Sequence, residues 1–542
     1  MNLNDMLEHA EALTVMGKSH ATHEFPPANI HKRLFVYWEW ATFGSPKMIE
    51  LTSIHPLTYA FLLGLGFVVS AVSVAQRRRN IPLPPGPSQV DIVPDKQLFL
   101  QFYEFGKRYS PVFSLKMGKE LFIIITGYKD ALDILQKQGV DVEDRPRYVS
   151  AGEIASGQMR VVFLDHGERL RRAFHDQLQP SVATRYQPLQ FKYSKQYIVD
   201  LLRDPDRHME YARKYTTSVI LSLAYGRKTP THIDDPEVNA IDRAVKRVVD
   251  CFQPGAYLVD TFPILKYIPI PEIRTLRQYH QDELALFRGL LDVVRQQIAN
   301  KEDIQPSFAS YILERQRELE LSDDETAYLV GEIFGAGADT TASAISFIAM
   351  AAACFPGEQA KVQEQIDNVV GDGRLPTFED QEDLPLVTAF MLETHRWRPV
   401  STGVPHRASK DIIWNGYVIP KGATVIGDHW SILRDPEFFP DPEIFRPERW
   451  FDKRGGIRDD VKMLGFGFGR RVCPGQPIAD RSVWINAALL LWSFKMRQDP
   501  SKPIDDMGYK AGITAQIHPF KLIFEPRHQL DKMKHLLTST VE

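Results

Sequence analysis

One cysteine near the C-terminal end of the chain lies in a setting that could support chemistry. The segment FGFGRRVCPG, from Phe466 to Gly475, surrounds Cys473 with glycines, aromatic rings and arginines. The apolar run 477–494 predicts a helix just beyond the cysteine, and backbone N–H groups at a helix N-terminus favour a thiolate. Glycines let the backbone curl around the sulfur, and Arg471 adds positive charge. A buried, inert thiol is the alternative that this segment alone leaves open.

Other uses of cysteine fit this sequence less well. Zinc is disfavoured because no second cysteine or histidine lies near Cys473 at ligand spacing. A nucleophilic cysteine needs a histidine base, which no local motif supplies. The three cysteines, Cys251, Cys354 and Cys473, are widely separated and odd in number, so a disulfide framework is not expected.

A long apolar helix with a polar centre is the second feature. Ser322 and Glu325 form a capping box, and apolar residues continue to Phe355, a span of about 34 residues or ~50 Å. Its middle, GAGADTTAS (residues 335–343), combines helix-weakening glycines with threonines that can bond to preceding carbonyls. Because the carboxylate of Asp339 needs a partner when buried, this centre favours a proton-delivery groove over simple close packing of helices.

The third pattern is a carboxylate with two guanidinium groups. Glu393 and Arg396 lie three residues apart and share a helix face. Arg449, in the segment PERW, could join the same carboxylate, because arginine binds carboxylates through a two-pronged fork. Most such pairs are solvated and contribute little, so this pattern gains meaning only beside the other two.

Together these motifs closely resemble those of the cytochrome P450 family. The family's haem-ligand signature F-x-x-G-x-R-x-C-x-G is met by Phe466, Gly469, Arg471, Cys473 and Gly475. Its long-helix motif is met by Ala336, Gly337, Asp339, Thr340 and Thr341. The E-x-x-R and P-E-R motifs follow in matching order, and the resemblance extends from the proline-rich segment 81–87 to Pro526.

The resemblance implies a mainly α fold with small β-sheets, the cytochrome P450 fold, preceded by one N-terminal transmembrane helix. It implies a haem b whose iron takes the Cys473 thiolate as axial ligand. Asp339 and Thr340 would relay protons to bound O2. The family's structural network corresponds to Glu393, Arg396 and Arg449.

One part of the family's pattern is altered. Its tryptophan and arginine beside a haem propionate are replaced by Leu170 and Phe174 in HGERLRRAFH. By resemblance, the propionate contacts fall to His406, Arg471 and Arg145, which therefore join the expected cofactor-binding residues.

The substrate and the electron source are also implied only by resemblance. The sequence is similar to fungal microsomal members of secondary metabolism, such as O-methylsterigmatocystin oxidoreductase-like enzymes, and the expected substrate is lipophilic, for example a terpenoid. Electrons would come from NADPH through a separate cytochrome P450 reductase. The pocket candidates are Val161, Phe163, Phe334, Ala338, Val400, Thr402 and Ile513. A haem-thiolate isomerase or dehydratase, or a non-catalytic haem-binding sensor, is the alternative.

The N-terminal part predicts a membrane anchor. Residues 51–76 carry no charge apart from weakly basic His55 and are followed by three arginines, which predicts one span with the rest of the chain in the cytosol. A buried core helix and a cleaved signal peptide are the alternatives. The expected location is the endoplasmic reticulum membrane, and a net charge of -4 gives no indication of nucleic-acid binding.

Five segments are expected along the chain. The extension 1–50 has no assigned role, and the anchor 51–76 is followed by a basic and proline-rich linker, 77–96. The haem domain then spans 97–526, and 527–542 forms a tail. Within the domain we predict a strand hairpin over 113–128, helices over 235–251 and 271–298, and strands over 411–425.

Overall fold

Long segments with helical periodicity form helices, and short β-branched segments form small sheets. The computed structural model describes residues 81–88, 92, 97–165, 170, 173–174, 177–227, 234–251, 255–510, 514 and 516–539. Within them the protein is mainly α-helical, with one four-stranded and two two-stranded sheets, which confirms the predicted fold class. The predicted extension and membrane anchor lie outside the described residues.

The four-stranded sheet begins with the predicted hairpin. β1 (Val112–Met117) and β2 (Glu120–Ile125) pair antiparallel around Gly118, whose φ is 59°. β6 (Thr424–Gly427) pairs in parallel with β2, and β3 (His406–Arg407) pairs antiparallel with β6. The order is therefore β1-β2-β6-β3, which places His406 on the edge strand.

The second hairpin also follows its sequence signal. β4 (Ile412–Trp414) and β5 (Tyr417–Ile419) are joined by Asn415 and Gly416, both with positive φ, as a tight hairpin turn requires. The strands predicted over 411–425 are confirmed, but the last of these residues belong to β6 in the other sheet.

Helices make up most of the remaining body, and a third sheet lies near its C-terminal end. That sheet pairs β7 (Phe494–Gln498) antiparallel with β8 (Leu522–Pro526). The helices are α4 (Leu98–Arg108), α5 (Tyr128–Ala131), α7 (Pro180–Ala183), α8 (Gln187–Arg203), α9 (His208–Tyr225), α10 (Pro236–Cys251), α11 (Leu258–Thr261), α12 (Pro271–Ala299), α13 (Phe308–Arg315), α14 (Asp323–Cys354), α15 (Pro356–Val369), α16 (Pro385–Trp397), α17 (His429–Ile432), α18 (Gln476–Ser493) and α19 (Leu530–Thr538). The helices predicted over 235–251 and 271–298 are confirmed as α10 and α12.

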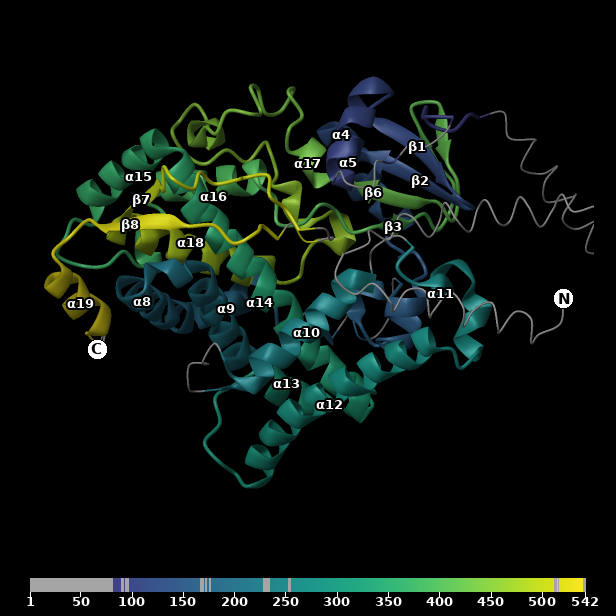
Figure 1. Cartoon of the computed structure of the whole chain (residues 1–542), viewed down its shortest axis with the longest axis horizontal. Coiled ribbons are helices and arrows are strands. Elements are labelled where there is room, and N and C mark those ends of the chain that lie inside the picture. The colour runs from purple at the N-terminus through teal and green to yellow at the C-terminus, as the bar shows by residue number, and fades with distance from the viewer. Residues whose placement is uncertain are drawn as a thin grey trace, which may run out of the picture.

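The arrangement places α14 through the middle of the body. Figure 1 shows the four-stranded sheet with α4 and α5 toward one end, and α8, α15 and α19 toward the other. α14 packs against α9, α12 and α18. Its N-terminus carries the predicted capping box, in which Ser322 accepts from the backbone of Glu325 and the Glu325 side chain reaches back.

α14 is helical throughout, including the polar centre. Among the residues that the structure describes, α14 is the one helix that is long and apolar enough to cross a membrane. However, 78% of its most apolar stretch of 18 residues is buried inside the protein. That burial is typical of a core helix.

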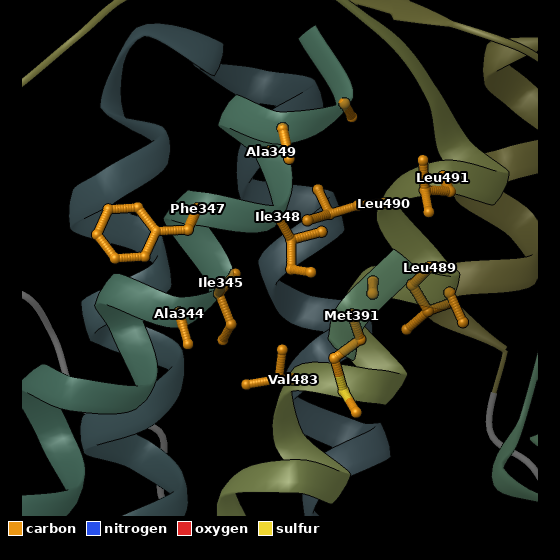
Figure 2. Packing of buried hydrophobic residues seen from close by; sticks show 14 of the residues in the cluster. Ala344, Ile345, Phe347, Ile348, Ala349, Met391, Val483, Leu489, Leu490 and Leu491 are labelled. Atoms are coloured by element: carbon orange, nitrogen blue, oxygen red, sulfur yellow. The ribbon is translucent and has the colours of Figure 1, made fainter. Parts of the chain in front are cut away.

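The main apolar cluster forms where α14, α16 and α18 meet. In Figure 2, Ile348 of α14 lies next to Leu490 of α18, and Ile345 of α14 and Met391 of α16 belong to the same apolar cluster. All four side chains are at most 5% exposed. α18 leads back to the cysteine loop, so this cluster supports the segment that carries Cys473.

We expect Gly331→Ala in α14 to destabilise the protein by about 1–3 kcal/mol, because the added methyl group would overlap the buried ring of Phe287 in α12. Gly289→Ala, in α12 with nothing near its Cβ position, is the matched control and should stabilise by up to about 1 kcal/mol. Urea denaturation followed by circular dichroism measures both. A gain in stability for Gly331→Ala would contradict the packing described here.

Candidate functional site

The cysteine loop brings Cys473 to the start of α18. The backbone N–H of Cys473 donates to the carbonyl of Phe466 at 2.8 Å, and α18 begins at Gln476. Cys473 keeps exposed surface although protein atoms crowd around its sulfur. Burial raises the pKa of the Cys473 thiol, whereas the N–H groups of Gly475 and Gln476 lower it. The helix N-terminus therefore acts on the sulfur as predicted, although the effect of burial on the pKa is larger.

The two signature glycines of the loop have different roles. Gly469 has a φ of 52°, and a Cβ there would come within 2.8 Å of the Leu135 carbonyl oxygen, so only glycine fits. Gly475 has an ordinary φ of -82°. A Cβ on Gly475 would lie 3.9 Å from the Cys473 Sγ, so this glycine is the one that adjoins the sulfur.

Two of the predicted cofactor residues bind the same short segment of backbone. Arg145 Nε donates to the carbonyl of Val162 at 3.0 Å, and its Nη1 donates to the carbonyl of Pro405 at 2.7 Å. Arg471 Nη2 donates to the carbonyl of Leu164 at 2.7 Å. Segment 161–164 thus holds both guanidinium groups.

The third predicted residue, His406, lies beside these arginines. Its Nδ1 is 2.8 Å from the carbonyl of Val142. Burial, followed by the positive charge of Arg145 and, to a lesser degree, of Arg471, holds the pKa of His406 well below its usual range. The imidazole is therefore neutral, and the cluster carries positive charge from both arginines.

These residues fit a haem. The described part of the chain holds no group of three or more His, Cys, Asp or Glu side chains that could bind a metal ion. Cys473, a residue with exposed surface, could supply a single sulfur ligand to a haem iron. The positive cluster of Arg145 and Arg471 beside a neutral His406 suits the carboxylates of haem propionates.

The two altered positions of the family pattern are buried in the core. Leu170 and Phe174 are 4% and 7% exposed and belong to an apolar cluster, where the rings of Phe174 and Phe308 lie 5.7 Å apart. Both positions are thus used for packing, and neither offers a polar contact.

α14 has one open strip within an otherwise buried surface. Ala336 is exposed and Thr340 is partly exposed, and because they are four residues apart they lie on one helix face. The Thr340 hydroxyl donates to the carbonyl of Ala336 at 2.8 Å. The predicted back-bonding of threonine is therefore present at Thr340 without interrupting the helix.

Phe334 and Ala338, two of the predicted pocket residues, do not share this strip. Both lie on the opposite side of α14 from Ala336, and they are 0% and 3% exposed within an apolar cluster. The Ala338 carbonyl accepts from the Thr216 hydroxyl of α9 at 2.6 Å. Because an α-helix has 3.6 residues per turn, residues two positions before or after Ala336 lie on the other side of the helix, against the core.

Asp339 is held by partners that the sequence did not reveal. Its carboxylate accepts from Arg213 Nη2 of α9 at 2.9 Å and also from the side chain of Gln516. Arg213 also pairs with Asp242 of α10 at 3.1 Å. Adjacent helical residues do not face each other, so Asp339 is turned away from Thr340. Arg213 and Gln516 lie far from Asp339 in the sequence and outside any motif, which is why sequence reasoning missed them.

The structure brings Glu393, Arg396 and Arg449 together. Arg396 binds both carboxylate oxygens of Glu393 at 2.8 and 2.9 Å, and Arg449 Nε binds Oε1 at 3.0 Å. The Trp450 indole N–H and the Arg446 backbone N–H complete the set at 3.0 and 2.8 Å. The motif PERW contains Trp450, so the sequence offered a signal for this donor. No feature of the sequence indicated that the backbone N–H of Arg446 would donate to Glu393. The carboxylate has no exposed surface.

The remaining pocket candidates are scattered. Val161, Phe163, Val400 and Thr402 are partly buried. The Phe163 ring lies 5.3 Å from that of Tyr148, and Val400 packs against the main apolar cluster. Ile513 lies outside the described residues.

Comparison with known proteins gives a consistent result. Residues 84–524 match the family model "Cytochrome P450". "Cytochrome P450 monooxygenase 113" of Postia placenta is 50% identical over 473 residues, which are 85% of this chain and 95% of that protein. "Cytochrome P450 monooxygenase 64" of the same fungus is 49% identical over 478 residues, 86% and 96% of the two chains. A cytochrome P450 monooxygenase of Armillaria gallica is 33% identical over 473 residues, 82% and 90%.

We expect Glu393→Gln to cost at least about 3 kcal/mol of stability, because it removes the charge that a buried set of guanidinium and N–H donors requires. Guanidinium denaturation followed by circular dichroism measures the loss. Glu104→Gln, which breaks an exposed pair with Lys107, is the control and should change stability by less than about 0.5 kcal/mol. Equal effects of the two substitutions would show that the buried cluster has no special role.

Proposed function

The chain belongs to the cytochrome P450 family and is a P450 monooxygenase, and we propose that it oxidises a lipophilic small molecule while anchored to a membrane. The observation that carries the chemistry is the position of Cys473, exposed at the N-terminus of a buried helix within a complete haem-ligand signature. A sulfur so placed is fixed in direction by the loop behind it and by the N–H groups beside it.

The chain's own residues hold the cofactor from several sides. Cys473 would supply the sulfur ligand of a haem, and the guanidinium groups of Arg145 and Arg471, with His406, would bind its propionate carboxylates. A haem with a thiolate ligand supplies O–O cleavage and oxygen insertion when it is bound. The Glu393 cluster acts at a distance, because His395 of the same helix packs edge-on against the Phe466 ring of the cysteine loop at 5.6 Å.

Proton delivery is assigned to Thr340 and Asp339. The Thr340 hydroxyl lies on the open strip of α14 and holds its proton on the Ala336 carbonyl. The Asp339 carboxylate is held by Arg213, whose side chain is 38% exposed and so reaches solvent. Arg213 thus links the buried carboxylate to the solvent-exposed surface of the protein.

The proposed substrate is a fungal secondary metabolite such as a terpenoid. The fungal origin of the similar monooxygenases and the apolar character of the remaining pocket candidates support this class. Electrons are proposed to come from NADPH through a separate reductase. The uncharged segment 51–76 with the arginines after it supports a single-pass anchor in the endoplasmic reticulum membrane, with the catalytic domain in the cytosol.

The function is tested by co-expression with an NADPH–cytochrome P450 reductase in yeast, followed by product profiling on terpenoid scaffolds. We expect oxygenated products that require NADPH, and a reduced carbon monoxide complex with the red-shifted absorption band of thiolate ligation. Cys473→Ala should abolish both the band and the products. If the band persists in Cys473→Ala, another residue is the iron ligand, and products formed without NADPH would contradict a monooxygenase.

Thr340→Ala should lower product yield per NADPH by about tenfold or more and raise hydrogen peroxide release, because it removes the hydroxyl proton on the open strip of α14. Ser346→Ala is the matched control: its hydroxyl makes the same bond to a preceding carbonyl, but in the buried part of the helix. Parallel assays of NADPH, peroxide and product measure the coupling. Unchanged coupling in Thr340→Ala would reduce this threonine to a packing role.

A further inference from the structure

Glu332 has a buried carboxylate that has no role in the haem site or in the proton delivery proposed above. It lies on α14 and is 6% exposed. Its Oε2 accepts from the backbone N–H of Val161 at 2.7 Å, and its Oε1 accepts from that of Val162 at 3.3 Å. A buried carboxylate is costly unless it is paired, and here it uses both oxygens on one short turn, Val161–Phe163.

The same turn is held from its other side by the arginines of the cofactor site. Arg145 donates to the carbonyl of Val162, so this one peptide segment joins Glu332 to Arg145. Arg471 donates to the carbonyl of Leu164, two residues further on. Segment 161–164 therefore connects a carboxylate on the long helix with the two guanidinium groups beside His406.

Asp165 closes the arrangement at the end of the segment. Its Oδ1 accepts from the Arg145 backbone N–H at 3.0 Å, and its Oδ2 pairs with Arg407 at 3.0 Å. Arg407 belongs to β3, next to His406. The segment is thus tied to the edge strand of the four-stranded sheet as well as to α14.

We propose that Glu332 is a positioning residue for the haem: by fixing the amides of Val161 and Val162, it sets the segment whose carbonyls orient Arg145 and Arg471 toward the propionates. This rests on the haem site of the proposed function. The proposal also accounts for the altered family pattern. Leu170 and Phe174 pack in the core. The arginines are instead oriented by the backbone of segment 161–164, which Glu332 of α14 holds in place. A guanidinium held by a carbonyl keeps its remaining N–H donors in a fixed direction.

A second buried carboxylate nearby provides a matched control. Glu283 of α12 is 5% exposed and pairs with Arg160, directly before the turn. Removing its charge changes the same buried region through another partner, Arg160. It leaves the hydrogen bonds of Val161, Val162 and Leu164 in place.

The test compares Glu332→Gln and Glu283→Gln as purified holoenzymes. Transfer of haem to excess apomyoglobin gives the rate of haem loss, and circular dichroism melting reports the fold. We expect Glu332→Gln to lose haem about tenfold faster than the wild type, as is typical when a residue behind a cofactor ligand is changed. Glu283→Gln should stay within about twofold, because it does not contact the segment. The thiolate band of the reduced carbon monoxide complex should persist in both variants.

A double-mutant cycle separates positioning from general loosening. If Glu332 acts through Arg145, then Glu332→Gln combined with Arg145→Lys should lose haem more slowly than the product of the two single effects predicts. The effects of Glu283→Gln and Arg145→Lys on the rate of haem loss should instead multiply. Haem loss unchanged in Glu332→Gln, or equally raised in Glu283→Gln, would overturn the proposal.

Two further outcomes keep the result clear. A wild-type protein without haem or without the thiolate band would contradict the proposed function itself rather than the role of Glu332. If Glu332→Gln fails to fold, hydrogen exchange on the wild-type holoenzyme decides: the Val161 and Val162 amides should be strongly protected, and rapid exchange at both would overturn the proposal.

Discussion

A single carboxylate without solvent contact, that of Glu393, constrains the half of the molecule that carries the cysteine. An unpaired charge at this depth would cost several kcal/mol, so the chain must bring donors to it. They come from α16 itself, through Arg396, and from the segment 446–450, in which Pro447–Trp450 form a 3-10 turn. The carboxylate therefore ties this short turn to α16. α16 then presents His395 to the Phe466 ring, and the geometry of the cysteine loop depends on that support.

Local features of the fold could be predicted because the residues that fix them are close in sequence. The hairpin at Gly118 and the turn at Asn415 and Gly416 depend on a backbone conformation that their own residue types favour. The capping box of Ser322 and Glu325 likewise lies within four residues. The long-range assembly was not readable: β6 joins β2 in parallel although about three hundred residues separate them.

The candidate site shows the same division. Cys473, Glu393, Arg396 and Arg449 lie in motifs whose spacing is fixed by one loop or one helix turn. A motif indicates which helix carries the chemistry, but not which of its faces is open: Phe334 and Ala338 lie on a buried face. Arg213, Gln516 and Glu332 have no local signal, since their partners lie on other elements. Only the tertiary structure pairs them.

Three of the buried carboxylates, those of Glu393, Glu332 and Asp339, differ in how easily they could exchange partners. Arg396 and Arg449 beside Glu393 are 0% and 4% exposed, so water cannot replace them and the cluster is static. Glu332 is bound by backbone amides, which can leave only if the turn itself moves. Asp339 instead depends on Arg213, which is 38% exposed and shared with Asp242. Arg213 thus has a second carboxylate partner and contact with solvent, which the arginines beside Glu393 lack. The fold therefore keeps fully enclosed charge behind the cysteine loop and partly solvated charge on the Asp339 face of α14.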